Sequence, residues 1–90
     1  MNTVHINLAG CKSSDQIHQL LKEQLDFPYF YGANLAALWD CLTGFIETPV
    51  KVVFHGLDAL PADTRKATED IISIFERAER QGQDVYVEIA

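Results

Sequence analysis

The sequence lacks any long apolar segment, and it has few positively charged residues. No apolar run approaches the roughly 20 residues that a helix needs to span a bilayer. Seven Lys and Arg against 13 Asp and Glu give a net charge of −6 at pH 7. Such an excess of negative charge disfavours DNA, RNA and anionic membranes as partners. The first residues, MNTVHINLAG, contain neither Lys nor Arg, so we expect no signal peptide and a cytoplasmic protein.

The chain is also poor in the groups that catalysis and metal binding require. Its two cysteines, Cys11 and Cys41, stand in no CxxC or metal-ligand spacing, which favours free thiols in a reducing compartment. The histidines have no triad spacing; we expect His5 and His55 in or beside strands and His18 on a polar helix face. The five glycines are scattered and form no phosphate-binding loop. We therefore expect a protein that is not an enzyme, with no catalytic residue, metal or cofactor.

The pattern of apolar residues, together with the residues that begin and end helices, predicts one domain, residues 1–90, with six elements. Helix starts are expected at Ser13 or Ser14, at Asn34, and at Asp63 or Thr64, and helix ends at Pro28, Gly44 and Gly82. The predicted elements are strand 3–8, a helix between residues 14 and 27, helix 35–43, strand 50–54, a helix over about 65–81 and strand 84–89. A loop at 56–61 has room for one short helical turn.

The predicted order is strand, helix, helix, strand, helix, strand. Strands separated by helices favour parallel pairing, because parallel neighbours need crossover connections of this length. The sequence therefore predicts an α/β fold with a small three-stranded parallel sheet packed with helices.

The segment 28–44, PYFYGANLAALWDCLTG, is the most unusual part of the sequence. Six of the nine aromatic residues fall between residues 27 and 45: Phe27, Tyr29, Phe30, Tyr31, Trp39 and Phe45. From residue 23 to residue 50 the chain contains four acids and no Lys or Arg. Dense aromatics with uncompensated negative charge are typical of a surface that docks onto a basic partner.

Helical periodicity separates two faces of the helix at 35–43. At about 100° per residue, Leu35, Leu38 and Leu42 cluster on one side, which predicts that they face the core. Asp40 lies opposite them, and Trp39 lies at the border. For Leu35 a core role and a contact role are both open, and Asn34 is first of all a helix cap. Three large aromatics, Phe30, Trp39 and Phe45, exceed what so small a core needs.

The same segment resembles the barstar family of intracellular ribonuclease inhibitors. The resemblance rests on Phe30-Tyr31-Gly32, on Asn34 and on the run from Leu35 to Gly44, which contains the uncommon residues Trp, Cys and Gly. Weaker similarity extends over almost the whole chain. The resemblance implies a small three-stranded parallel sheet and a chain that is monomeric when free.

The resemblance also implies a partner and a set of contact residues. The partner would be a basic ribonuclease, of the extracellular type or a toxin, bound one to one, and this chain would act as its inhibitor or immunity protein. Asp40 would enter the ribonuclease active site and meet the cations that otherwise hold the scissile phosphate. The implied contact positions are Phe30, Gly32, Asn34, Leu35, Ala36, Trp39, Asp40, Thr43, Gly44, Phe45 and Glu47, with Arg77 and Gln81 at the periphery.

Several of these positions depart from the family pattern. Acids of the family are replaced by Ala36, Arg77 and Gln81, and a tyrosine by Phe30. The central acid Asp40 therefore remains while much of the charged rim is lost. A protein-interaction module of the same fold with another kind of partner stays open as an alternative, because fold alone does not fix the partner.

Overall fold

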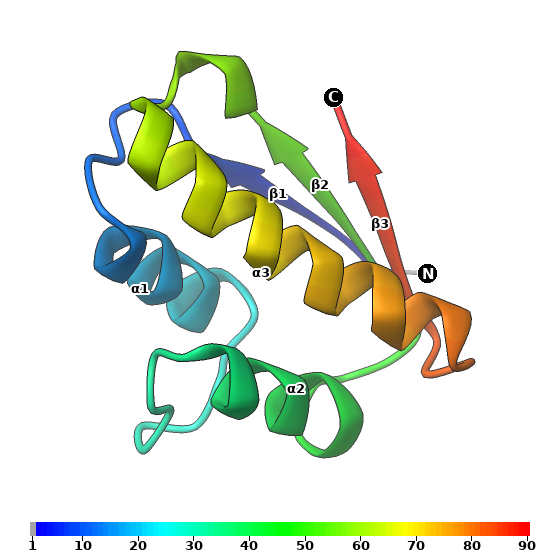
Figure 1. The fold of residues 1–90 in the computed structure, drawn as a ribbon. Helices are drawn as coiled ribbons and strands as arrows, with labels where there is room; N and C mark the ends of the chain where they lie inside the picture. Colours follow the sequence, from blue (N-terminus) through cyan, green and yellow to red (C-terminus); the bar gives the residue numbers. More distant parts are fainter. Residues whose placement is uncertain (1) are drawn as a thin grey trace.

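The computed structural model describes residues 2–90 and has the predicted order of strands and helices. Its elements (Figure 1) are β1 (Asn2–Asn7), α1 (Ser14–Gln24), α2 (Leu35–Gly44), β2 (Val50–His55), a 3-10 helix η1 (Leu57–Ala59), α3 (Ala62–Arg80) and β3 (Val85–Ile89). β1 and β3 both pair in parallel with β2, so the strand order is β1-β2-β3. The predicted three-stranded parallel sheet is confirmed.

The core lies between one face of the sheet and the three helices, which lie on the same side of the strands in Figure 1. Alternate residues of a strand point to opposite faces. On the covered face Ile6 and Phe54 are fully buried, and the rings of Phe54 and Phe75 pack edge to face at 5.3 Å. His5 and His55 lie on strands, as predicted. A ring nitrogen of His5 and one of His55 form a hydrogen bond of 2.8 Å.

α1 begins as predicted and ends earlier than predicted. Ser13 is its N-cap, and the Ser13 Oγ accepts a hydrogen bond from a backbone N–H of the first turn at 3.3 Å. The prediction that Pro28 ends the helix is wrong, because the last helical residue is Gln24. Asp26 has a φ of 56°, and the Phe27 N–H donates to a carbonyl of the last turn at 3.0 Å. This is the closing geometry of a Schellman motif, which ends a helix without proline.

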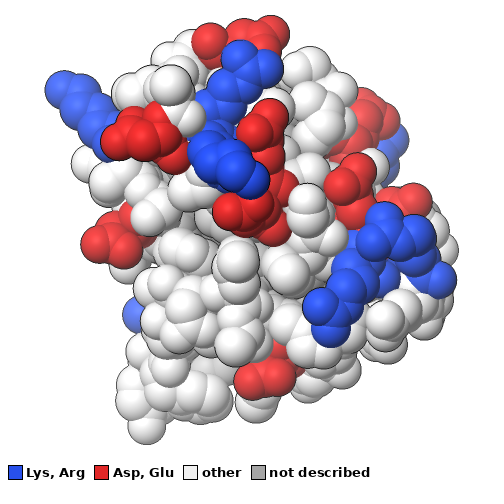
Figure 2. All heavy atoms as spheres, in the orientation of Figure 1, with Lys and Arg blue, Asp and Glu red and all other residues white. Residues whose placement is uncertain are grey.

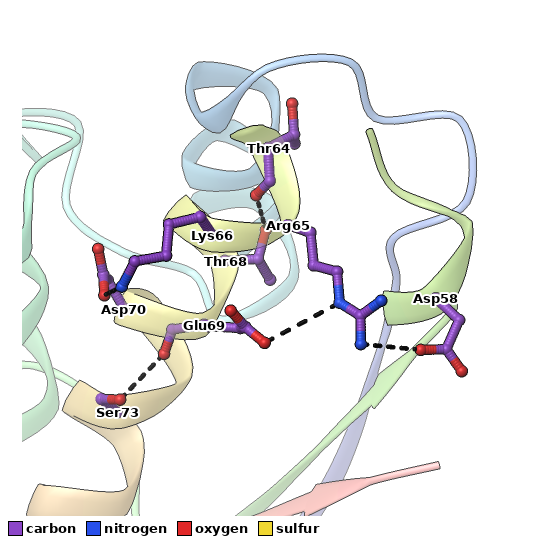
Figure 3. Close-up of polar contacts among 8 residues, drawn as sticks. All are labelled: Asp58, Thr64, Arg65, Lys66, Thr68, Glu69, Asp70 and Ser73. Atoms are coloured by element: carbon purple, nitrogen blue, oxygen red, sulfur yellow. Dashed lines mark hydrogen bonds and ion pairs between the residues drawn. The ribbon is translucent and has the colours of Figure 1, made fainter. Parts of the chain in front are cut away.

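α3 begins three residues before its predicted start, and neither Asp63 nor Thr64 caps it. Its N-cap is Pro61, whose missing N–H costs nothing at a helix start because the first N–H groups have no partner within the helix. The Thr64 hydroxyl instead donates to the Lys12 carbonyl at 3.1 Å and ties α3 to the segment before α1. Figure 3 shows the first turns of α3, where its side chains form ion pairs with one another and with Asp58 of η1.

The other helix ends confirm one prediction and correct another. Gly82, with a φ of 73°, follows the last turn of α3 and ends it as predicted. Gly44 does not end α2 but is its last helical residue, and Phe45 is the C-cap. None of the helices within residues 2–90 has the length and apolar character needed to cross a membrane.

Candidate docking surface

The loop between α1 and α2 is held against α1 by two aromatic residues. Phe27 is buried, and the Tyr31 ring packs on it with the ring centroids 4.9 Å apart. The Tyr31 hydroxyl and the Nδ1 atom of His18 form a hydrogen bond of 2.6 Å, which joins the loop to α1. These contacts fix the loop against α1. Tyr29 and Phe30, which lie between Phe27 and Tyr31, are exposed.

Tyr29, Phe30 and Phe45 form an exposed row of rings, here called the aromatic row. The exposed fractions are 89% for Tyr29, 61% for Phe30 and 56% for Phe45. Neighbouring rings meet edge to face, with centroids 5.5 Å apart for Tyr29 and Phe30 and 5.7 Å apart for Phe30 and Phe45. A contiguous exposed apolar cluster is typical of a surface that binds another molecule. As predicted, the core does not take up all three large aromatics: Phe30 and Phe45 are exposed, while Trp39 is partly buried against it.

The start of α2 is fixed to this loop by Asn34. Its Oδ1 accepts the backbone N–H of Ala37 at 2.8 Å, and its Nδ2 donates to the Gly32 carbonyl at 3.2 Å. In this loop the residue with a positive φ (51°) is Ala33, not Gly32. Gly32 provides space instead: a Cβ atom there would lie 3.2 Å from Asn34 Nδ2 and 3.5 Å from Ala37 Cβ.

Replacement of Asn34 by alanine is expected to lower the free energy of unfolding by about 1 kcal/mol, because the first turn of α2 loses its cap. Asn34→Ser keeps a capping oxygen and should recover most of this loss. Urea denaturation of the three proteins measures the effect. Equal stability of Asn34→Ala and the wild type would contradict a capping role.

The two faces of α2 are arranged largely as predicted. Leu38 and Leu42 are buried, Trp39 is half-buried, and Asp40 is exposed. Of the two roles left open for Leu35, the core role is wrong, since Leu35 is 39% exposed. Leu35 lies at the edge of the helix packing, where it lines a hollow with residues of α1 and α3, among them His18 and Ile71.

Asp40 lies at a hollow between the loop and α2. The hollow has a volume of about 240 Å³ and is lined by Phe30, Tyr31, Gly32, Ala37, Asp40, Cys41 and Phe45. Figure 2 shows that the surface over α2 and the preceding loop is mostly uncharged, with one acidic patch over α2. Within residues 2–90 the Asp40 carboxylate forms no ion pair and accepts no side-chain hydrogen bond. The site therefore presents an uncompensated carboxylate next to aromatic rings.

A cation borders this surface on α3. The Arg77 guanidinium carbon lies 4.0 Å from the centroid of the Trp39 ring, a cation–π contact that joins α3 to α2. In Figure 2, Lys and Arg side chains gather over the C-terminal end of α3. Arg77 is exposed, and so is Gln81, the C-cap of α3. Both peripheral positions of the predicted site are therefore accessible.

The remaining predicted contact residues divide into two groups. Ala36, Thr43 and Gly44 are exposed on α2, although the Thr43 hydroxyl donates to the Trp39 carbonyl at 2.9 Å. Glu47 is exposed but follows the end of α2, and it lines a different hollow, beside β1 and the end of α1. Because α2 ends at Gly44, Glu47 does not continue the helical face that carries Asp40.

His18 holds the loop through Tyr31, a role that was not predicted from the sequence. The prediction that it lies on a polar helix face is wrong: its side chain is 6% exposed. Leu21 and Leu25 follow His18 at spacings of three and seven residues, which place all three on one face of a helix. This spacing could have predicted the burial of His18.

Burial of His18 predicts a pH dependence of stability. Desolvation lowers the pKa of His18 in the folded chain, and the charge of Asp15 partly opposes this. The unfolded chain, in which the pKa is near 6.5, then binds a proton more readily than the folded chain. Stability should therefore fall as the pH drops from about 7.5 through 6.5.

Thermal melting at pH 7.5 and 5.5 measures this effect. The fall in Tm between the two pH values should be smaller for His18→Gln than for the wild type. A fall of the same size in His18→Gln and in the wild type would contradict this assignment.

Both cysteines are free thiols, as predicted. Burial raises the pKa of Cys11 and of Cys41, which keeps both protonated and weakly nucleophilic. Among residues 2–90 there is no group of three or more His, Cys, Asp or Glu that could hold a metal ion.

An α/β domain with an anchored aromatic loop and an uncompensated carboxylate has the features of a protein-binding domain. The whole chain, residues 1–90, matches the family model described as Barstar (barnase inhibitor). It is also 30% identical over 86 residues to the "Putative ribonuclease inhibitor YrdF" of Bacillus subtilis (strain 168). That alignment covers 96% of this chain and 94% of the relative. The chain therefore belongs to the barstar family, and this membership supports a ribonuclease-inhibitor-like role.

Proposed function

We propose that the chain is a cytoplasmic inhibitor of a bacterial ribonuclease and acts by covering the active site of the enzyme. The loop 27–33 and α2 would form the contact, with Asp40 in the place of a substrate phosphate. The observation that carries this proposal is the exposed Asp40 carboxylate, which has no partner within residues 2–90 and lies at a hollow walled by Phe30 and Phe45.

The chemistry of the carboxylate suits this role. A carboxylate accepts charge-assisted and often bidentate hydrogen bonds from arginine, much as a phosphate does. The aromatic row would pack against the rim of the active site and exclude water, which strengthens the ionic contacts. No bond is made or broken in this mechanism. The chain therefore needs no catalytic residue, metal or cofactor, and it is not an enzyme.

The remaining contact positions would complete the complementary shape around Asp40. Gly32 and Asn34 hold the loop close to α2, and the exposed side chains or backbone of Leu35, Ala36, Thr43 and Gly44 lie on the same helix. We propose a one-to-one complex with a basic ribonuclease, secreted or delivered as a toxin, and a free chain that is monomeric. The net charge of −6 would attract a basic partner at low ionic strength.

Capture with two matched baits tests this function. The wild-type chain and Asp40→Ala are immobilised in parallel and exposed to barnase and to the products of the reading frames beside this gene. We expect the wild type to retain a ribonuclease and to inhibit its cleavage of RNA, and Asp40→Ala to do neither. The chain alone should cleave no RNA. A retained partner without nuclease activity would instead favour an interaction module with another role.

A further inference from the structure

Two arginines at the edge of the docking surface have no ionic partner within the chain. Three cations, Lys51, Arg65 and Lys66, form ion pairs, and the latter two lie in the first turns of α3 (Figure 3). Arg77 and Arg80 form no ion pair with any part of the chain that the structure describes. Lys12 and Lys22 form none either, but they lie before and within α1, whereas Arg77 and Arg80 lie together at the end of α3.

Neither of the two acids beside these arginines in sequence, Glu76 and Glu79, forms an ion pair with them among the residues that the structure describes. Glu79 lies between them, and its Oε1 accepts the backbone N–H of Val87 on β3 at 2.8 Å. Arg77 and Arg80 are both exposed, and residues three apart lie on the same side of a helix. Together they make a cationic patch, here called the arginine pair.

Arg77 is held in place for binding. Its guanidinium carbon lies 4.0 Å from the Trp39 ring centroid, and Trp39 precedes Asp40 in α2. Stacking on a ring covers the face of the guanidinium and leaves its N–H groups free to donate to a carboxylate. A side chain that is already ordered loses less conformational entropy on binding than a mobile one. Arg77 is therefore preorganised to bind a carboxylate at the rim of the docking surface.

We propose that the arginine pair binds an aspartate or glutamate of the partner, next to the active site that Asp40 covers. This inference rests on the proposed function and adds a specificity rule to it. The partner would present cations where it holds phosphate and an acid where it faces the end of α3. A ribonuclease with Lys or Arg at that rim position would be rejected by like-charge contact.

Charge reversals on a known probe test this rule. The probe is barnase. It is used unchanged and as a panel of variants, each of which has one Lys or Arg around the active site replaced by Glu. Affinity is measured for the wild-type chain, Arg77→Glu, Arg80→Glu and the matched control Lys66→Glu. Lys66 pairs with Asp70 at 3.1 Å near the opposite end of α3. Lowering the positive charge of barnase should in general weaken its binding to a chain of net charge −6. A gain in affinity therefore identifies a local ion pair.

We expect at least one reversal variant to bind the wild-type chain about tenfold more tightly than barnase does, the order found for close interfacial charge pairs. This gain should be lost with Arg77→Glu or Arg80→Glu and kept with Lys66→Glu. The inference is overturned if no variant gains affinity, or if the gain survives both arginine reversals. If Asp40→Ala binds the panel as the wild type does, the proposed contact through Asp40 fails together with the inference. If the wild-type chain binds no member of the panel, the inference is overturned, while the proposed function is still tested by the capture experiment described above.

Discussion

Replacement of Asp40 by alanine should abolish ribonuclease inhibition and leave the fold intact. Asp40 is exposed on the face of α2 opposite Leu38 and Leu42, so the core does not depend on it. Alanine is also the better helix former. We therefore expect the free energy of unfolding to change by no more than about 0.5 kcal/mol, as for most surface substitutions.

The binding loss has a separate cause. Without the carboxylate, the phosphate-binding cations of the ribonuclease would be buried with no counter-charge, which typically costs about 2–5 kcal/mol. The dissociation constant should rise by at least about 30-fold. Calorimetric titration measures binding, and thermal melting measures stability. Asp58→Ala removes an exposed carboxylate from η1 and should bind like the wild type. Wild-type affinity of Asp40→Ala would mean that the docking face is wrongly assigned.

Leu38→Ala should have the opposite effect. Leu38 is fully buried on the inner face of α2, so its truncation leaves a cavity in the core. Losses of this kind cost about 2–5 kcal/mol of stability, which corresponds to a fall in Tm of at least about 8 °C for a domain of this size.

Urea denaturation checks the loss of stability, and Ala36→Ser on the exposed face of the same helix is the control. At a temperature where Leu38→Ala remains folded, its affinity for the ribonuclease should stay within a few-fold of the wild type. A binding loss as large as that of Asp40→Ala would contradict the separation of the two faces.

The order of elements and the parallel sheet could be predicted from the sequence, because both follow from local patterns. Apolar periodicity gave the helices and strands, and helical crossovers require parallel pairing. The helix ends were less predictable because different end signals compete. Pro28 is a strong local signal, yet Asp26 ends α1 earlier by adopting a left-handed backbone. Asp63 and Thr64 are good caps, yet the helix begins before them at Ala62.

The candidate site was predictable where it depends on helical geometry and less so where it depends on tertiary contacts. The outward position of Asp40 follows from 3.6 residues per turn. The order of burial among Phe27, Phe30 and Tyr31 does not, because it is set by packing against α1 and by the hydrogen bond to His18. The contact between Arg77 and Trp39 joins two helices that are far apart in sequence, and no local pattern indicates it.

Competition with a substrate analogue tests the proposed occlusion most directly. The ribonuclease captured by the wild-type chain is titrated with that chain at rising concentrations of a mononucleotide that occupies its phosphate-binding site. If Asp40 takes the place of the phosphate, the apparent Kd of the chain should rise in proportion to the nucleotide concentration once this exceeds the Kd of the nucleotide. Unchanged affinity for the nucleotide-saturated enzyme, with chain and nucleotide bound together, would contradict the occlusion of the active site.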